Sequence, residues 1–307
     1  MKTEFNNATK LSIYEMVTRQ ILRNLASGEI PWRKTWTATK GKKHPFCNYF
    51  SGKPYSFINT LLLGEPGEYA TYQQIEKAGG HILKGHHGRM IILWSNFVPQ
   101  KDKELYDRLA REGKDNSHLE IWFLKKFTVF NVEKDAVGVQ RKKEETPAAP
   151  MVASEDPTDI ADIVVDDYTI NQNVTVKTEE GLKPDYDPIT DLVTMPQKKA
   201  FTYEEDFYAE LMSQLVHSTA SEERCNRKSE LKNMSEGEMT AREELIAEIG
   251  SSMILTVTGM KRRETHEQLS AQCQKWIKMM NDDVRLIVNA SNGAEKAAKL
   301  ILGTHAA

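Results

Sequence analysis

The residues of this chain that come nearest to a catalytic pattern lie between positions 213 and 217. Two histidines four residues apart on one helix, with a glutamate directly after the first, bind zinc, and the glutamate takes a proton from the attacking water. In the same frame this chain has Ser213, Gln214 and His217. A hydroxyl is a poor zinc ligand, and a glutamine amide accepts no proton at physiological pH. The pattern therefore predicts a helix that lacks both the first ligand and the general base.

Length and composition indicate the class of protein. The chain has 307 residues, of which 39% are hydrophobic and 28% charged, as expected for a soluble globular protein with two domains. No apolar run approaches the roughly 18–20 residues of a membrane span. The start, MKTEFNNATK, lacks the apolar region of an export signal. Cys47, Cys225 and Cys273 show no paired spacing, so we expect free thiols and a cytoplasmic location.

Charge divides the chain into two unlike halves. Residues 1–145 contain 24 Lys and Arg against 16 Asp and Glu, whereas residues 146–307 contain 17 against 28. This asymmetry predicts two domains with different partners, and a polyanionic partner for the first.

Hydrophobic periodicity predicts the elements that position these residues. A helix is expected over about Thr9–Ser27, followed by short strands that include Met90–Trp94 and Phe127–Phe130. The charged segment Lys101–Ser117 is either a helical insertion or a mobile loop. A polar, proline-bearing stretch marks a linker at residues 144–156.

The second half is expected to hold a small sheet and several helices. Short strands are predicted at Val174–Val176 and within Tyr186–Val193. One amphipathic helix is expected to carry Tyr208, Leu211, Met212 and Leu215 on one face, and the next helix starts with a capping box at Thr240–Glu243. The predicted fold class is α+β. It comprises an α+β domain at residues 1–143 and a mostly helical domain with a small sheet at residues 157–307.

Several phrases along the chain together resemble the ArdC antirestriction family of conjugative plasmids and other mobile elements. They are Ile30–Trp36, Asn48…Gly52-Lys53-Pro54-Tyr55…Asn59, Thr71–Gln74…Gly79-Gly80…Lys84-Gly85…Gly88, Phe127–Asn131, Tyr186-Asp187-Pro188…Asp191…Met195-Pro196, a helix over Leu211–Arg227, and Glu243–Glu248. The resemblance implies an N-terminal domain that binds single-stranded DNA and a C-terminal domain with a zincin-like metallopeptidase fold. Members of the family protect incoming plasmid DNA from host restriction.

With that resemblance, the cations and aromatic rings of the first half become candidates for DNA binding. Single strands are bound by cations along the phosphates and by aromatic faces that stack on bases, at about 1–3 kcal/mol per base. The alternative for Trp32 and Trp36 is that they are core residues, as buried tryptophans usually are. The predicted DNA-binding set is Trp32, Arg33, Lys34, Trp36, Lys42, Lys43, Tyr49, Lys53, Tyr55, Lys84 and Arg89.

The resemblance also locates a third zinc ligand in the phrase Glu243–Glu248. Glu243 would occupy the N3 position of the predicted capping box and turn back to the helix start, so Glu244 is the better candidate. His217 and Glu244 would then be the only remnants of a ligand set. We therefore predict no cofactor, no bound zinc and no peptidase activity, because loss of the base alone lowers the rate by about two to four orders of magnitude.

The sequence thus predicts a non-enzymatic, single-stranded-DNA-binding antirestriction-type protein of a mobile element. Its zincin-like domain would be a scaffold or a contact module. The expected partners are single-stranded DNA and a host restriction or conjugation protein, without a membrane. Two alternatives stay open: a residual zinc-dependent hydrolase with an unconventional ligand set, and a protein-binding decoy of a host restriction component.

Overall fold

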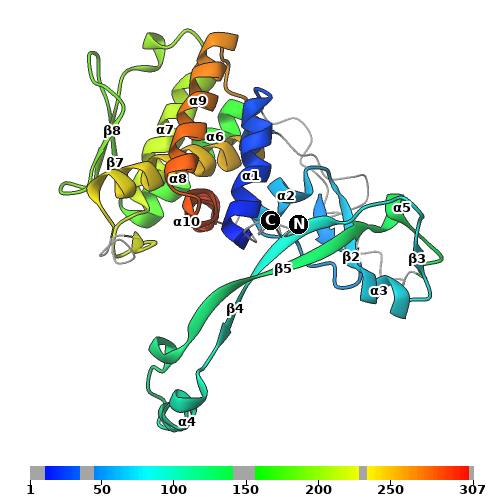
Figure 1. Ribbon diagram of the computed structural model, residues 1–307. Helices are drawn as coiled ribbons and strands as arrows, with labels where there is room; N and C mark the ends of the chain where they lie inside the picture. Colours follow the sequence, from blue (N-terminus) through cyan, green and yellow to red (C-terminus); the bar gives the residue numbers. More distant parts are fainter. Residues whose placement is uncertain (1–10, 35–44, 141–155, 228–233, 304–307) are drawn as a thin grey trace, which may run out of the picture. The chain divides into compact units, whose positions relative to one another are not determined.

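The computed structural model describes residues 11–34, 45–140, 156–227 and 234–303 (Figure 1). The described residues form two compact units. The first holds residues 11–13, 46–55 and 65–140, and the second holds the remainder. Trp36, Lys42, Lys43 and most of the predicted linker lie outside the described residues. Within the described ranges no helix is both long and apolar enough to cross a membrane.

The first unit is an α+β domain around a four-stranded sheet with the order β1-β2-β5-β4. β1 runs parallel to β2, and the other neighbours are antiparallel. Ala70, Ile75, Val132 and Ala136 form a small core beside the sheet. The elements are β1 (Phe46–Asn48), β2 (Gly67–Thr71), α3 (Tyr72–Lys77), β3 (His81–Ile82), β4 (Arg89–Phe97), η2 (Gln100–Asp102), α4 (Lys103–Arg111), η3 (Ser117–Leu119), β5 (Ile121–Asn131), α5 (Val132–Asp135) and β6 (Ala136–Val137).

The longest strands of the first unit are β4 and β5, which pair from Arg89↔Val129 to Phe97↔Ile121. Both strands predicted in this region are confirmed as parts of these longer ones. The charged segment that joins them is helical, because it contains η2, α4 and η3. Figure 1 shows α4 at the far end of the paired strands.

The second unit is mostly helical, with a small sheet of the order β7-β9-β8. The predicted α+β fold class is therefore confirmed for the whole chain. The elements are α1 (Ile13–Ala26), η1 (Pro31–Arg33), α2 (Phe57–Leu63), α6 (Pro157–Gln172), β7 (Thr175–Thr178), β8 (Asp185–Asp187), β9 (Leu192–Met195), η4 (Lys198–Ala200), α7 (Glu204–Ser218), α8 (Glu236–Thr258), α9 (His266–Asp282) and α10 (Leu286–Leu302).

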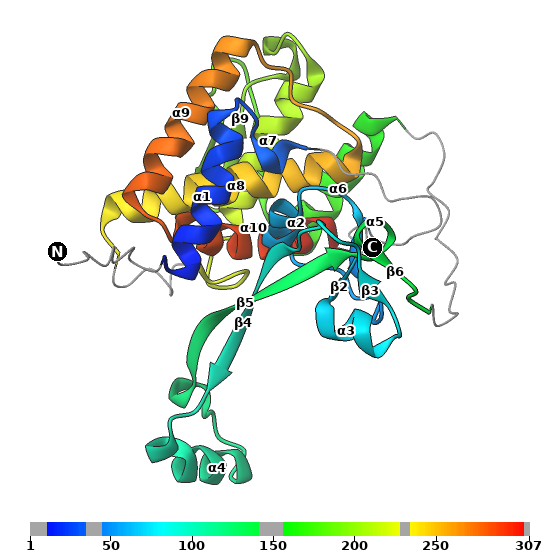
Figure 2. The ribbon, with the colours of Figure 1, turned by 45° about the vertical axis from the view of Figure 1, so that its right-hand side comes forward.

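Helix α8 is the centre of the second unit, and it contacts both α7 and α10 (Figure 2). Two glycines allow the helices to approach closely. A Cβ atom at Gly250 would lie 3.0 Å from Val216 of α7, and one at Gly293 of α10 would lie 2.8 Å from Ile246. Larger residues at these positions would push the helices apart.

Three elements from the first 64 residues pack within the second unit. Thr18 of α1 donates a hydrogen bond to the carbonyl oxygen of Val284 at 2.7 Å, and the Phe57 backbone N–H of α2 donates to Glu295 at 3.1 Å. η1 packs on α8. The compact units therefore do not coincide with two successive stretches of sequence.

Two predicted details of the second unit are wrong. α8 begins at Glu236 with a capping box between Ser235 and Glu238, not at Thr240. α7 ends at Ser218, and residues 219–225 form turns and a bend, so the helix predicted over Leu211–Arg227 is interrupted there. The acidic segment after residue 156 forms α6, a helix that the sequence had not indicated.

Candidate functional site

Helix α7 carries the residues that stand in the zinc-binding frame. Leu211, Met212, Leu215 and Val216 are buried on its core side, which confirms the predicted amphipathic helix. Ser213, Gln214 and His217 are half-buried between these positions. Because residues four apart share one face of a helix, the Ser213 hydroxyl and the His217 imidazole lie on the same side of α7.

The environment of His217 favours its neutral form. Burial lowers the pKa of His217, and Arg227 acts in the same direction, whereas Glu243 opposes both. Among the acidic residues, Glu243 has the largest electrostatic effect on this histidine, ahead of Glu244.

Glu243 is already engaged by a buried arginine. Arg227 donates from Nε to Oε1 of Glu243 at 3.0 Å and from Nη2 to Oε2 at 2.8 Å. The same guanidinium donates to the Thr219 hydroxyl at 2.5 Å and to the carbonyl oxygen of Val216 at 3.0 Å. Arg227 thus ties the end of α7 to α8 and neutralises the carboxylate next to His217.

The reason for preferring Glu244 as a remnant ligand does not hold. Glu243 is not at N3 of α8, because the helix starts seven residues earlier, at Glu236. Glu244 instead pairs with Lys275 at 2.9 Å, and its side chain is 41% exposed. Among the described residues, no three His, Cys, Asp or Glu side chains are arranged to hold a metal ion. One histidine and two carboxylates that are each paired with a cation do not fit a tetrahedral zinc site.

A second arginine fixes the segment that follows α7. Arg224 pairs with Asp191 through both terminal nitrogens. It also donates to the backbone carbonyl oxygens of Ser218 at 2.8 Å and Gln172 at 3.0 Å. Because the last carbonyls of a helix have no partner within it, these bonds stabilise the ends of both α7 and α6.

Trp32 and Arg33, which were predicted to bind DNA, are structural residues of the second unit. Trp32 is 2% exposed, its ring meets Trp276 edge-on at 6.1 Å, and its Nε1–H donates to Glu248 at 3.2 Å. Arg33 pairs with Glu248 at 2.6 Å and with Glu264. The alternative reading of Trp32 as a core residue is therefore correct.

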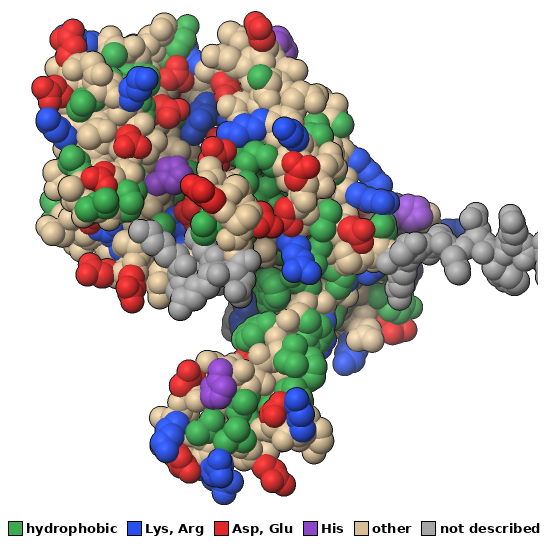
Figure 3. All heavy atoms as spheres, turned by 60° about the vertical axis from the view of Figure 1, so that its left-hand side comes forward, with side chains coloured by type: hydrophobic (Ala, Val, Ile, Leu, Met, Phe, Trp, Pro, Cys, Tyr) green, Lys and Arg blue, Asp and Glu red, His purple; other side chains and the backbone are tan. Residues whose placement is uncertain are grey.

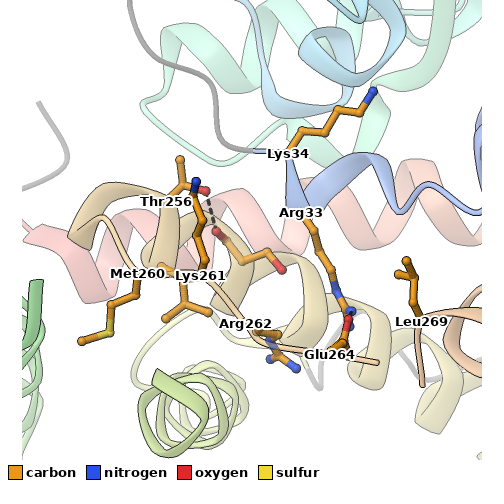
Figure 4. A pocket seen from close by; sticks show the side chains of 10 residues that line it. Arg33, Lys34, Thr256, Met260, Lys261, Arg262, Glu264 and Leu269 are labelled. Atoms are coloured by element: carbon orange, nitrogen blue, oxygen red, sulfur yellow. Dashed lines mark hydrogen bonds and ion pairs between the residues drawn. The ribbon is translucent and has the colours of Figure 1, made fainter. Parts of the chain in front are cut away.

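Glu248 is the buried carboxylate that accepts hydrogen bonds from both Trp32 and Arg33. Burial alone would raise the pKa of Glu248, but Arg262 and Arg33 outweigh it and hold the pKa below its usual range. Figure 4 shows Arg33 and Glu264 pointing toward each other at the side of a 540 Å³ cavity that Arg262 also lines. Because two carboxylates neutralise Arg33, it is a poor candidate for a phosphate contact.

The remaining described candidates are spread over both units. Lys34 pairs with Glu29 at 2.7 Å in the second unit. In the first unit, Lys53 and Lys84 are exposed, whereas Tyr49 and Tyr55 are half-buried. Tyr49 packs against the small core of that unit.

Arg89 is engaged within the first unit. It donates to the Tyr69 hydroxyl at 2.7 Å and pairs with Glu65 at 3.3 Å. The structure therefore leaves Lys53 and Lys84 as the exposed cations of the predicted set in this unit.

The strands β4 and β5 carry exposed aromatic residues that the sequence reasoning missed. Trp94 and Trp122 lie on them together with the exposed Lys125 and Lys126. The sequence did contain a signal for an interaction surface, because neither strand contains Asp or Glu. The predicted strands, Met90–Trp94 and Phe127–Phe130, did not include Trp122, Lys125 or Lys126.

Comparison with known proteins gives matches to both halves of the chain. Residues 11–130 match the N-terminal domain of anti-restriction factor ArdC, and residues 164–293 match the zincin-like metallopeptidase family. The crystal structure of antirestriction protein ArdC from plasmid R388 in its Mn(II)-bound form has a TM-score of 0.66 to this chain, and the metal-free form 0.65. Both are 26% identical and cover 96% of this chain, and the chain covers 99% and 98% of them.

A DNA primase TraC of Escherichia coli is 27% identical over 312 residues, which cover 97% of this chain. The match covers only 20% of the primase, so the chain spans a fifth of that relative's length.

Proposed function

Because this chain is an ArdC-type protein that joins the ArdC N-terminal domain to a zincin-like metallopeptidase domain, we propose that it binds single-stranded DNA and that its zincin-like domain is a catalytically inactive scaffold. It would act in the cytoplasm and protect the incoming DNA of a mobile element from host restriction. The antirestriction protein of plasmid R388 shares this fold.

The proposal of an inactive scaffold rests on the types and the pairing of the residues around His217. Gln214 stands where a general base is needed, and Ser213 where a second histidine is needed. The carboxylate beside His217 is held by both oxygens in the ion pair with Arg227. The group therefore lacks both the second histidine ligand and the glutamate base that an active zinc site of this kind uses.

Two observations support DNA as the partner. The first half of the chain has a surplus of eight positive charges, because its 24 basic residues outnumber 16 acidic ones. A relative that matches over nearly the whole chain is a DNA primase, so the same segment occurs within an enzyme that handles DNA.

The proposal is tested with the full-length protein and a fluorescently labelled single-stranded oligonucleotide, by anisotropy. We expect binding at about 50 mM salt that weakens steeply toward about 200 mM, because each phosphate contact releases counterions. A mixed-sequence duplex of equal length should compete poorly. Absence of binding at low salt, or binding that salt does not weaken, would refute the DNA partner.

A further inference from the structure

The paired strands β4 and β5 extend beyond the rest of the sheet in the first unit. β2 pairs with β5 only from Val129 to Asn131. From Ile91↔Phe127 to Phe97↔Ile121, the two strands pair only with each other. We call these two segments, Ile91–Phe97 and Ile121–Phe127, the β4–β5 arm. An isolated two-stranded arm buries little surface of its own. Packing in a core therefore does not explain the large apolar side chains on it.

The arm exposes large apolar side chains on both of its faces. Directly opposed residues of an antiparallel pair share a face, and successive residues alternate. Trp94 and Trp122 therefore lie on one face, two positions apart along the strands. Leu93, Phe97, Ile121 and Phe127 lie on the other face.

These six side chains are between 38% and 55% exposed. Figure 3 shows hydrophobic side chains gathered along this part of the surface. Contiguous exposed apolar surface of this kind marks an interaction site.

The charges of the arm identify the kind of partner. Neither β4 nor β5 contains an acidic residue. Lys125 and Lys126 are both exposed and lie between the aromatic positions of β5, with the Lys125 ammonium 5.3 Å from the centre of the Phe123 ring. The acidic residue next to the arm, Glu120, accepts hydrogen bonds from Asn96 and Tyr106. Aromatic faces with cations between them and no anions match a single-stranded nucleic acid.

We propose that the β4–β5 arm is the surface on which this protein binds single-stranded DNA. Bases stack on Trp94 and Trp122, and Lys126, which lies on the same face of the arm as the two tryptophans, contacts the phosphates. Recognition by stacking and by phosphate contacts does not depend on base identity, so the arm binds without sequence preference. This inference rests on the proposed function, because it assigns the residues that carry out DNA binding.

Variants of the full-length protein test the stacking residues. Trp122→Ala is expected to weaken binding of a labelled single-stranded oligonucleotide about 5- to 150-fold, the range for loss of one stacked base. Trp94→Ala should act in the same direction. Tyr72→Ala is the matched control, because Tyr72 is 53% exposed in the same unit but lies on α3. The affinity of this variant for the oligonucleotide should equal that of the wild type.

A further variant tests the phosphate contact. Lys126→Gln should lower the slope of log affinity against log salt by about 0.7, because each phosphate contact to a single strand contributes about 0.7. Lys101→Gln with Lys103→Gln, exposed cations beyond the arm, should leave the slope unchanged. Since all these residues are exposed, the thermal unfolding temperature should not change.

The outcomes distinguish failure of the assignment to the β4–β5 arm from failure of the proposed DNA binding. If the wild type binds no single-stranded DNA at low salt, the proposed function itself fails. If the wild type binds and the Trp94, Trp122 and lysine variants bind equally well, the arm is excluded and DNA binding stands. Equal DNA binding together with loss of self-association in the tryptophan variants, seen by sedimentation, would assign the arm to a protein contact and overturn the proposal.

Discussion

Arg227 and Glu243 form an ion pair with two parallel hydrogen bonds, of 3.0 Å and 2.8 Å, in which the arginine side chain is 2% exposed and the glutamate side chain 19%. This pair joins the segment after α7 to the middle of α8, and it occupies the carboxylate that acts most strongly on His217. A metal ion at His217 would have to compete with the guanidinium for the same oxygens. The pair therefore stabilises the fold at a place where a metallopeptidase needs a free ligand.

Removal of Arg227 should destabilise the protein strongly. Arg227→Met leaves Glu243 as an uncompensated charge, for which the expected loss is about 3–5 kcal/mol in the free energy of unfolding, measured with urea. Lys275→Met is the control, because the Lys275–Glu244 pair is 44% and 41% exposed and contributes less than about 1 kcal/mol. Similar losses in the two variants would contradict a structural role for the Arg227–Glu243 pair.

The stability of the protein should depend on pH through His217. Its pKa in the folded state lies below the ordinary value of 6.5, so the unfolded state takes up a proton at a higher pH than the folded state. The stabilisation is complete above pH 6.5 and decreases as the pH falls through 6.5 toward the folded pKa. His217→Gln should remove this decrease in urea titrations between about pH 8 and about pH 5.5.

His266→Gln provides the control for this measurement, since His266 is exposed. That variant should retain the wild-type dependence on pH. An unchanged pH dependence in His217→Gln would show that this histidine is not buried in its neutral form.

Helices and strands with strong local patterns could be predicted from the sequence. The apolar spacing of Leu211, Met212 and Leu215 indicated α7, and the β-branched and aromatic residues of Met90–Trp94 indicated part of β4. The start of α8 was missed because Ser235–Glu238 and Thr240–Glu243 both fit a capping box, and only the first is used. A local pattern cannot choose between two adjacent helix starts.

The contacts that define the candidate sites were not readable from the sequence, because they join distant residues. Arg227 and Glu243 are 16 positions apart, and Trp32 and Glu248 are 216 apart. A tryptophan beside an arginine has the same local sequence whether it is buried or stacks on a base. Only the packing of η1 on α8 places Trp32 in the core.

Trp32 should therefore matter for stability and not for DNA binding. Trp32→Ala removes a fully buried ring and a hydrogen bond to Glu248, with an expected loss of about 3–5 kcal/mol in unfolding free energy. The fraction that stays folded should bind single-stranded DNA with wild-type affinity. The exposed Trp122 should show the opposite pattern, so equal behaviour of the two variants would contradict the assignment.

A fragment that ends at residue 143 should fold poorly. It retains α1, η1 and α2 but loses the second-unit helices that they contact, so Val17, Ile21 and Leu25 lose their buried environment. We expect the fragment to bind a hydrophobic dye and to be cut by protease within residues 14–34, which full-length protein protects. Cooperative unfolding without dye binding would show instead that these residues fold independently of the second unit.

The metal content of the full-length protein tests the central claim most directly. The protein is purified without chelator, incubated with excess zinc, desalted and measured by elemental analysis, with His217→Ala in parallel. The account predicts that neither protein retains stoichiometric zinc, since one histidine and two carboxylates that are each paired with a cation do not form a ligand set. One zinc ion per wild-type chain that is lost in His217→Ala would contradict it.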